Sequence, residues 1–188
     1  MRLFTAIDLP TEARLRLERL LSALRPEAPI KWSPLDNLHI TTKFIGEWPE
    51  ARLEELHDAL AQVGPCEPFE LSLRGLGWYP NERAPRVLWV GVEAGTELSA
   101  LVQQIERRLA EIGVAKEERS FTPHLTLARI KHPAPLHALR QKVERLQPAD
   151  LGRFPIAHFS LFRSDPGSNA SVYRKLRDYR LEAALAAH

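Results

Sequence analysis

The sequence predicts an α+β protein with two lobes around a central cleft, built by two related halves of the chain. Short apolar strands alternate with amphipathic helices along the 188 residues, so that each half reads β-α-β-α-β. Three pairs of landmarks recur at offsets of 84 to 86 residues: Arg2 and Arg86, His39 and His124, and Pro49 and Pro135. This steady offset favours a duplicated unit with a pseudo-two-fold axis. We therefore expect one bilobal domain over residues 1–188, with sequence halves of about 1–85 and 86–188.

The first half contains three expected strands and two expected helices. The helix at residues 11–24 has leucines at helical spacing, with Thr11 as its N-cap and Glu12 in its first turn. A second helix, at residues 49–63, begins at Pro49 and ends before Gly64 and Pro65. Apolar residues that run together or alternate with polar ones predict strands at residues 3–9, 38–46 and 69–76.

The second half repeats this order. The segment RVLWVGVE at residues 86–93 predicts a strand in the place of the opening RLFTAIDL. A helix follows at residues 97–112 and ends at Gly113, and another is expected at residues 135–146. Further strands are expected at 124–130, 154–163 and, after a polar turn, 172–181. The order of the strands within the sheets does not follow from the sequence.

The composition is that of an ordinary folded protein with little net charge. Hydrophobic residues make up 44% and charged residues 27%, and 26 basic and 24 acidic residues leave a formal charge of +2. That charge is too small to coat duplex nucleic acid, so an anion would have to be bound at a focused site. The single cysteine, Cys66, excludes a disulfide or cysteine-zinc framework within the chain. With no signal-peptide core and no membrane-length apolar stretch, we expect a cytoplasmic monomer without an obligate protein partner.

Two His-x-Thr-x motifs occupy equivalent places on expected strands: His39-Ile40-Thr41-Thr42 and His124-Leu125-Thr126-Leu127. Residues i and i+2 of a strand share one face, so each histidine lies beside its threonine. If a two-fold axis relates the halves, two imidazoles and two hydroxyls meet across the cleft.

Such a site suits the opening of a cyclic phosphate. The attacking water must lose a proton and a ribose oxygen must gain one, on opposite sides of the phosphorus. Histidine, with a pKa of about 6.5, can perform either transfer at neutral pH. The threonine hydroxyls can donate to the non-bridging oxygens and stabilise developing charge. The paired motifs therefore predict a two-histidine catalyst.

Four segments, in this order, resemble the 2H phosphoesterase family in its RNA 2′,3′-cyclic phosphodiesterase branch, historically called 2′-5′ RNA ligases: RLFTAIDLP, NLHITTKFIGE at 37–47, FTPHLTLAR at 121–129 and LFRSDPGSNASVYRKL. They span nearly the whole chain. The resemblance implies a bilobal fold with antiparallel sheets and a reaction that needs no metal or other cofactor. Its substrate would be RNA with a 2′,3′-cyclic phosphate end, opened to a 2′-phosphate end.

The resemblance also implies roles for five residues: catalysis by His39 and His124, and phosphate binding by Thr41, Thr126 and Arg129. We expect His124 to be the base that activates water and His39 to be the acid. Phe44 stands five residues after its histidine, as Arg129 does, and would stack on a base. This odd spacing places Phe44 and Arg129 opposite the histidines in a regular strand, so a bulge or a twist would be required.

Three other functions compete with this interpretation. One is phosphodiester hydrolysis of a small cyclic nucleotide such as an ADP-ribose cyclic phosphate, and another is a non-catalytic module that binds RNA ends. The third is metal catalysis, which would need acidic or further histidine ligands at both motifs, whereas only Asp36 precedes the first. The sequence lacks a phosphate-binding glycine loop and a Lys-x-Asp-Gly motif, so any RNA joining would be an ATP-independent reversal of 2′-5′ cleavage.

Several other residues are expected to be structural. Five histidines lack a threonine partner and are expected to be structural or exposed: His57, His132, His137, His158 and His188. We expect Thr42 to pack and Trp89, in an apolar strand, to lie in the core. Lys43 shares the face of His39 in a regular strand, and Trp32 precedes the first motif closely enough to line the cleft.

Overall fold

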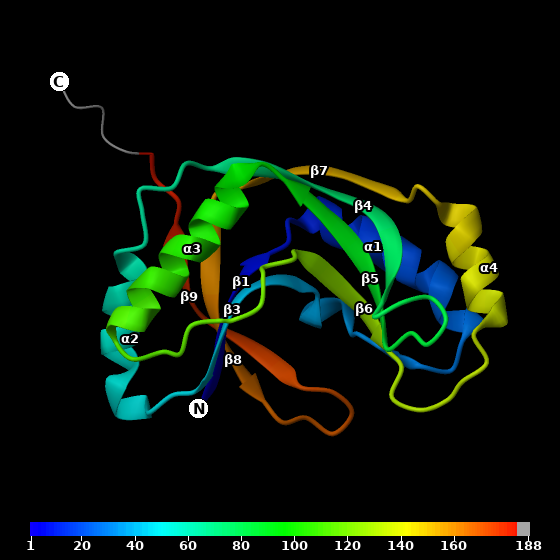
Figure 1. The fold of residues 1–188 in the computed structure, drawn as a ribbon, viewed down its shortest axis with the longest axis horizontal. Helices are drawn as coiled ribbons and strands as arrows, with labels where there is room; N and C mark the ends of the chain where they lie inside the picture. Colours follow the sequence, from blue (N-terminus) through cyan, green and yellow to red (C-terminus); the bar gives the residue numbers. More distant parts are fainter. Residues whose placement is uncertain (184–188) are drawn as a thin grey trace.

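The computed structural model describes residues 1–183. Figure 1 shows its elements, which are, in chain order, β1 (Arg2–Asp8), α1 (Thr11–Leu24), β2 (Lys31–Trp32), β3 (His39–Glu47), α2 (Leu53–Ala61), β4 (Phe69–Tyr79), β5 (Val87–Ala94), α3 (Thr96–Glu111), β6 (His124–Arg129), α4 (His137–Leu146), β7 (Asp150–Ile156), β8 (His158–Asp165) and β9 (Val172–Arg180). Short 3-10 helices lie at Arg25–Glu27, Leu35–Asn37 and Glu50–Arg52.

Most expected elements are present, with four differences. The expected strand at 154–163 is two strands, β7 and β8, which lie in different sheets. The sequence carries a sign of this break, because the buried apolar positions change phase between Ile156 and Phe159. The first turn of the expected helix at 49–63 is a 3-10 helix, and α1 has Pro10 rather than Thr11 at its N-cap, without a side-chain capping bond. The short strand β2 was not expected.

The strands form two antiparallel sheets that do not coincide with the sequence halves. The first sheet has the order β3-β1-β8-β9, and the second sheet has the order β2-β6-β5-β4-β7. The triplets β3-β1-β8 and β6-β5-β4 correspond to each other, but β8 comes from the second half and β4 from the first. Each half therefore completes the sheet of the other, so the halves cannot separate without breaking both sheets.

One main hydrophobic core joins the two sheets and the helices. Leucines of α1, such as Leu17 and Leu21, and apolar residues of α3, such as Leu101 and Ile105, are fully buried in it. A smaller buried group, formed by Phe4, Ala6 and Phe162, lies apart from this core. None of the helices of residues 1–183 is long and apolar enough to cross a membrane.

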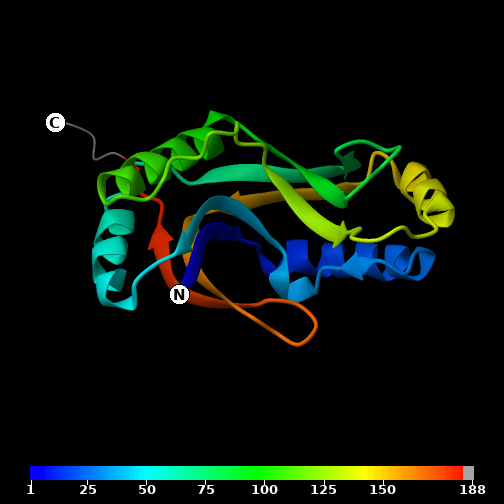
Figure 2. The same ribbon diagram turned by 60° about the horizontal axis from the view of Figure 1, so that its bottom comes forward.

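The strands that carry the two histidine motifs, β3 and β6, lie side by side where the two sheets meet (Figure 2). The chain that leads to the first motif is attached to the second. The backbone N–H of Ser33 donates to the carbonyl oxygen of Leu127 at 2.8 Å, and its hydroxyl donates to the carbonyl oxygen of Thr126, also at 2.8 Å. After these bonds a single 3-10 turn leads to His39, so the position of one motif is coupled to the position of the other.

Candidate active site

The first motif presents its histidine and threonine on one face of β3, as the period of a strand requires. His39 pairs with Asp8 and Thr41 with Ala6 across the ladder to β1. The His39 Nε2 atom lies 3.0 Å from the Thr41 hydroxyl oxygen. Ile40, between them, is fully buried on the opposite face. We call the face that carries His39 and Thr41, and its counterpart on β6, the motif face.

The second motif has the same arrangement on β6. His124 and Thr126 are accessible on the motif face, and Leu125 between them is fully buried. The Nδ1 atom of His124 donates to the Thr122 carbonyl oxygen at 2.8 Å, which fixes the proton on Nδ1 and leaves Nε2 available. At His39, where burial lowers the pKa of the ring, the backbone of Asn37, two residues earlier, acts to raise it.

A β-bulge interrupts β3 directly after the motif. Thr5 and Ala6 are consecutive on β1, but their partners on β3 are Lys43 and Thr41, so Thr42 is an extra residue. A bulge of this kind reverses the alternation of the side chains that follow it. Thr42 is buried, and its hydroxyl lies 2.7 Å from that of Thr5, so the expectation that it packs is confirmed.

The same bulge occurs at the equivalent position of β6. Leu88 and Trp89 are consecutive on β5, but their partners on β6 are Ala128 and Thr126, which makes Leu127 the extra residue. Leu127 and Ala128 are both fully buried, whereas a regular strand would bury only one of two neighbours. The two motifs therefore share the irregularity as well as their residue pattern.

The two bulges bring Phe44 and Arg129 onto the motif face. Phe44 pairs with Phe4 and remains 65% exposed, with the two ring centroids 6.3 Å apart. Arg129 pairs with Val87 and is exposed. The irregularity that their odd spacing required is thus present in both copies, and both side chains stand next to a His-Thr pair.

Lys43 turns away from the motif face because of the bulge, so the expectation that it shares the face of His39 is wrong. Its ammonium group is buried, 2.8 Å from a carboxylate oxygen of Glu106 on α3 and 2.7 Å from the Ala115 carbonyl oxygen. A buried ammonium group requires such partners. The pair fastens β3 to a helix of the second half.

Aromatic rings surround His39 on three sides. Phe4 stacks on the imidazole with centroids 4.8 Å apart, Tyr173 meets it edge-on at 5.1 Å, and Phe162 stacks at 6.0 Å. Burial lowers the pKa of His39 to about 4, although the Asn37 backbone hydrogen bond and the charge of Asp8 act in the opposite direction. His39 is therefore neutral at pH 7 in the free protein.

Three of the residues near His39 were given no role from the sequence, although all three lie in segments that resemble the family. Phe4 and Tyr173 form part of the aromatic enclosure. Asp8, opposite His39, forms an ion pair with Lys175 of β9, in which Nζ and Oδ2 are 2.8 Å apart. The alternation of side chains along the strand RLFTAID could have placed Phe4 and Asp8 on one face. It could not have placed Lys175 beside Asp8, because only the tertiary structure brings β9 close to the end of β1.

The structure corrects the expectation for Trp89 and shows where Trp32 lies. Trp89 is not part of the core: it pairs with Thr126, is partly exposed on the motif face, and its indole lies over Gly77 of β4. Trp32, opposite the fully buried Ala128, packs against the core and donates its indole N–H to the Ala28 carbonyl oxygen at 3.1 Å, rather than lining the motif face.

Histidines without a threonine partner lie elsewhere. His57 is buried with its Nδ1 atom 2.6 Å from the Tyr179 hydroxyl, and His158 lies 3.9 Å from Asp178. His132 and His137 are exposed, and His188 falls outside the described residues. Within residues 1–183, no three His, Cys, Asp or Glu side chains are grouped so as to hold a metal ion.

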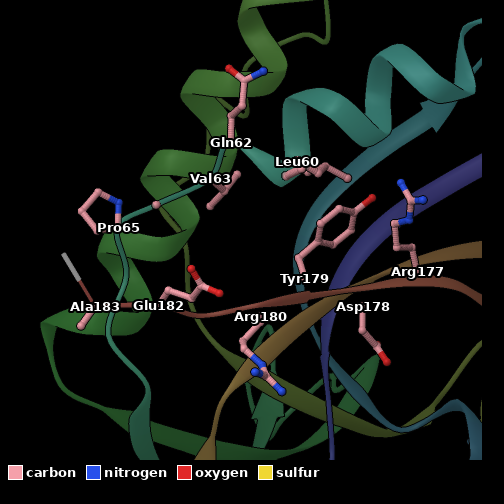
Figure 3. Close-up of a pocket in the computed structure, with 12 residues that line it drawn as sticks. Leu60, Gln62, Val63, Pro65, Arg177, Asp178, Tyr179, Arg180, Glu182 and Ala183 are labelled. Atoms are coloured by element: carbon pink, nitrogen blue, oxygen red, sulfur yellow. The ribbon is translucent and has the colours of Figure 1, made fainter. Parts of the chain in front are cut away.

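A pocket of about 710 Å³ lies between the end of α2 and β9, as Figure 3 shows. It is lined by residues 60–65 and 177–180 together with Glu182 and Ala183. Neither histidine motif contributes to it, and its charged side chains come from β9 and from Glu182, which follows it. The chemistry-bearing residues are gathered on the motif face instead.

Comparison with known proteins gives consistent results. The family model described as the 2′-5′ RNA ligase superfamily matches residues 9–168. The RNA 2′,3′-cyclic phosphodiesterase of Methanothermobacter thermautotrophicus is 32% identical over 96% of this chain and 99% of its own. The protein of that name from Thermus thermophilus is 37% identical over 96% and 90%.

Solved structures extend the likeness to the fold. The Thermus thermophilus protein TT0787 superposes with a TM-score of 0.83 at 32% identity, over 98% of this chain and 100% of its own. LigT of E. coli, in complex with 3′-AMP, superposes with a TM-score of 0.75 at 26% identity, over 96% and 97%. The mixed fold of helices and antiparallel sheets expected from the sequence is therefore confirmed.

Proposed function

This chain belongs to the 2′-5′ RNA ligase superfamily, and from that membership and its paired motifs we propose that it hydrolyses 2′,3′-cyclic phosphate ends of RNA to 2′-phosphate ends. Relatives 32% and 37% identical over most of their length are named RNA 2′,3′-cyclic phosphodiesterases. Identity at this level over whole chains supports the same reaction class, and the chemistry of the two motifs gives it a mechanism.

The observation that carries the proposal is the repetition of one local geometry on two neighbouring strands. Each copy has a histidine, a threonine on the same face and a bulge directly after the threonine. A single copy would be an ordinary strand. Two copies supply the pair of proton-transfer groups that displacement at phosphorus needs.

In the proposed reaction, His124 Nε2 accepts a proton from water as the water oxygen attacks phosphorus. The bond from phosphorus to O3′ breaks on the opposite side, and His39 donates a proton to that oxygen. A phosphate remains on O2′. The products therefore contain the elements of one water molecule, and each histidine must exchange its proton before the next turnover.

The buried position of His39 bears on this assignment. With a pKa of about 4, His39 carries little charge at pH 7 before substrate binds. The negative charge of a bound cyclic phosphate would favour the imidazolium form and raise this pKa. Binding and protonation of His39 are therefore coupled, and the two imidazoles share one catalytic proton.

The remaining residues of the motif face would hold the phosphate and the nucleoside. The hydroxyls of Thr41 and Thr126 donate to the non-bridging oxygens, and the guanidinium of Arg129 adds charge-assisted hydrogen bonds. Phe44, exposed beside the first motif, offers a ring on which a base can stack. These four roles are parts of the proposal.

Hydrolysis of a short RNA with a 2′,3′-cyclic phosphate end, measured in EDTA, tests the proposed function. The wild-type protein should yield a 2′-phosphate end, and His39→Ala and His124→Ala should each lose at least about 100-fold in kcat/KM. His132→Ala, an exposed histidine without a threonine partner, is the matched control. The proposal fails if EDTA abolishes turnover or if both variants keep wild-type rates.

The family description favours a second activity of the same site. Joining of RNA ends through a 2′-5′ linkage would be the chemical reversal of strand cleavage and would need no ATP. Incubating a cyclic-phosphate-ended RNA with a 5′-hydroxyl RNA should give a 2′-5′ product that His39→Ala and His124→Ala both fail to form. Product formed equally by these variants would exclude this site as its source.

A further inference from the structure

Trp89 stands on the motif face of the second sheet without a role in the proposed proton transfers. It is the ladder partner of Thr126, one strand away from the proposed phosphate site. Its indole is partly exposed and is not among the residues packed against the hydrophobic core. A partly exposed indole that does not pack against the core is available to stack on a base.

One glycine creates the space in which the indole lies along the sheet, and a second lies at ordinary contact distance from it. Gly77, opposite Trp89 on β4, lies under the six-membered ring so closely that a Cβ atom there would overlap it. A Cβ atom at Gly91, the partner of His124, would lie 3.4 Å from the ring. Because neither neighbour has a side chain, the indole rests against backbone on one side and turns its other side outwards.

The row of residues next to Trp89 continues the surface. Tyr79 is the ladder partner of Val87, two residues from Trp89, and is 60% exposed. On the same row, Val87 pairs with Arg129 and Arg129 pairs with Lys31, both of which are exposed. Neither Arg129 nor Lys31 forms an ion pair within residues 1–183. An aromatic half on β4 and β5 thus adjoins a basic half on β6 and β2.

We propose that this strip, formed by Trp89, Tyr79, Arg129 and Lys31, binds the single-stranded RNA immediately 5′ of the cyclic phosphate and makes the enzyme prefer RNA ends to cyclic mononucleotides. The inference rests on the proposed function and extends it. Aromatic platforms beside a basic track are the means by which proteins hold single-stranded nucleic acid without reading its sequence. Trp89 and Tyr79 stack on bases, and Lys31 contacts a backbone phosphate.

The position of the strip favours a strand over a small ligand. Tyr79 and Lys31 lie on the row of Arg129, two ladder steps beyond the row of His124, and each step of two residues spans about 7 Å along a strand. The long side chain of Arg129 can reach back from this row to the terminal phosphate, whereas Tyr79 and Lys31 lie beyond it. A mononucleotide held at His124 and Thr126 would not extend to Tyr79 and Lys31. The net charge of +2 also limits the protein to a few phosphate contacts rather than a long duplex track.

The test compares two substrates, a 2′,3′-cyclic mononucleotide and a single-stranded RNA of about ten nucleotides with a 2′,3′-cyclic phosphate end. Trp89→Ala should lower kcat/KM for the RNA about 10-fold, and at least five times more than for the mononucleotide. Trp89→Phe should recover part of the preference. Gly77→Ala, which places a methyl group where the indole lies, should reproduce the selective loss.

The controls separate this inference from the proposed function. Leu15→Ala, an exposed apolar residue on α1, should alter neither substrate. Equal losses on both substrates, or no loss with Trp89→Ala, would overturn the strip. If the wild-type protein opens neither substrate, the proposed function fails, and anisotropy with a labelled 2′-phosphate-ended RNA decides about the strip. About 10-fold weaker binding by Trp89→Ala supports it, and unchanged binding overturns it.

Discussion

Thr42 of β3 and Leu127 of β6 are the extra residues of two bulges at equivalent places in the two motifs. Each bulge follows a His-x-Thr segment and returns the second residue after it to the motif face. Phe44 and Arg129 stand next to the histidines for this reason and not because of their spacing in the sequence. Bulges beside functional sites commonly redirect a side chain in this way, and here the same device serves an aromatic ring in one copy and a guanidinium in the other.

The roles of the two histidines can be separated with a substrate whose 3′-bridging oxygen is replaced by sulfur. A thiolate leaves without protonation, so the sulfur substrate should restore His39→Ala to within about 10-fold of wild type and leave His124→Ala inactive. Initial rates with the oxygen and sulfur substrates provide the comparison. Restoration of His124→Ala alone would reverse the assignment of acid and base.

The enclosure of His39 predicts an unusual pH profile. Burial lowers the pKa of His39 to about 4. We therefore expect kcat/KM to remain high as the pH falls below 6 and to decline only near pH 4, where protonation of His39 gives the pair of imidazoles a second proton and leaves neither free to accept one from water. Tyr173→Ala opens the enclosure, so the acidic limb should move towards pH 6.5 and activity at pH 5 should fall. Tyr173→Phe retains the ring and should keep the limb near pH 4. A limb that stays at the same pH in Tyr173→Ala would contradict this account.

The two threonines should be separable from their buried neighbour. Thr41→Val and Thr126→Val remove a hydroxyl at nearly constant volume, and each should reduce kcat/KM by about 10- to 100-fold with little change in stability. Thr42→Val is the matched comparison, because its hydroxyl bonds Thr5 in the interior. It should cost about 1 kcal/mol of unfolding free energy and leave the rate near wild type. Steady-state rates and urea unfolding are measured on all three variants. The account is wrong if Thr42→Val lowers the rate while Thr41→Val and Thr126→Val lower only the stability.

The ion pair between Lys43 and Glu106 should matter for stability. Lys43→Met leaves the Glu106 carboxylate without its buried partner, which should cost about 3–5 kcal/mol in the free energy of unfolding. The double variant Lys43→Met/Glu106→Leu should recover much of this loss. Arg153→Met, which breaks the exposed pair with Glu70, should cost less than about 1 kcal/mol. Urea unfolding of the four proteins checks the order, and a Lys43→Met cost similar to that of Arg153→Met would refute it.

Much of the fold could be predicted because its signals are local. Leucine spacing fixed α1 to its observed ends at Thr11–Leu24, and Gly113 marked the end of α3. The break between β7 and β8 was missed because both sides are apolar, and only the phase of the burial separates them. Trp89 was placed in the core because an apolar strand is usually buried, whereas Gly77, on another strand, gives the indole a place on the motif face.

The sequence by itself determined the two His-Thr pairs and their faces, because side chains in a strand alternate with a period of two whatever surrounds them. It also predicted a duplication, since the order and spacing of elements are properties of the chain. Only the tertiary structure decided which strands pair, and therefore that each half completes the sheet of the other. It also decided the bulges, the enclosure of His39 by Phe4, Phe162 and Tyr173, and the exposure of Trp89. These depend on neighbours far apart in sequence, whose contacts no local pattern encodes.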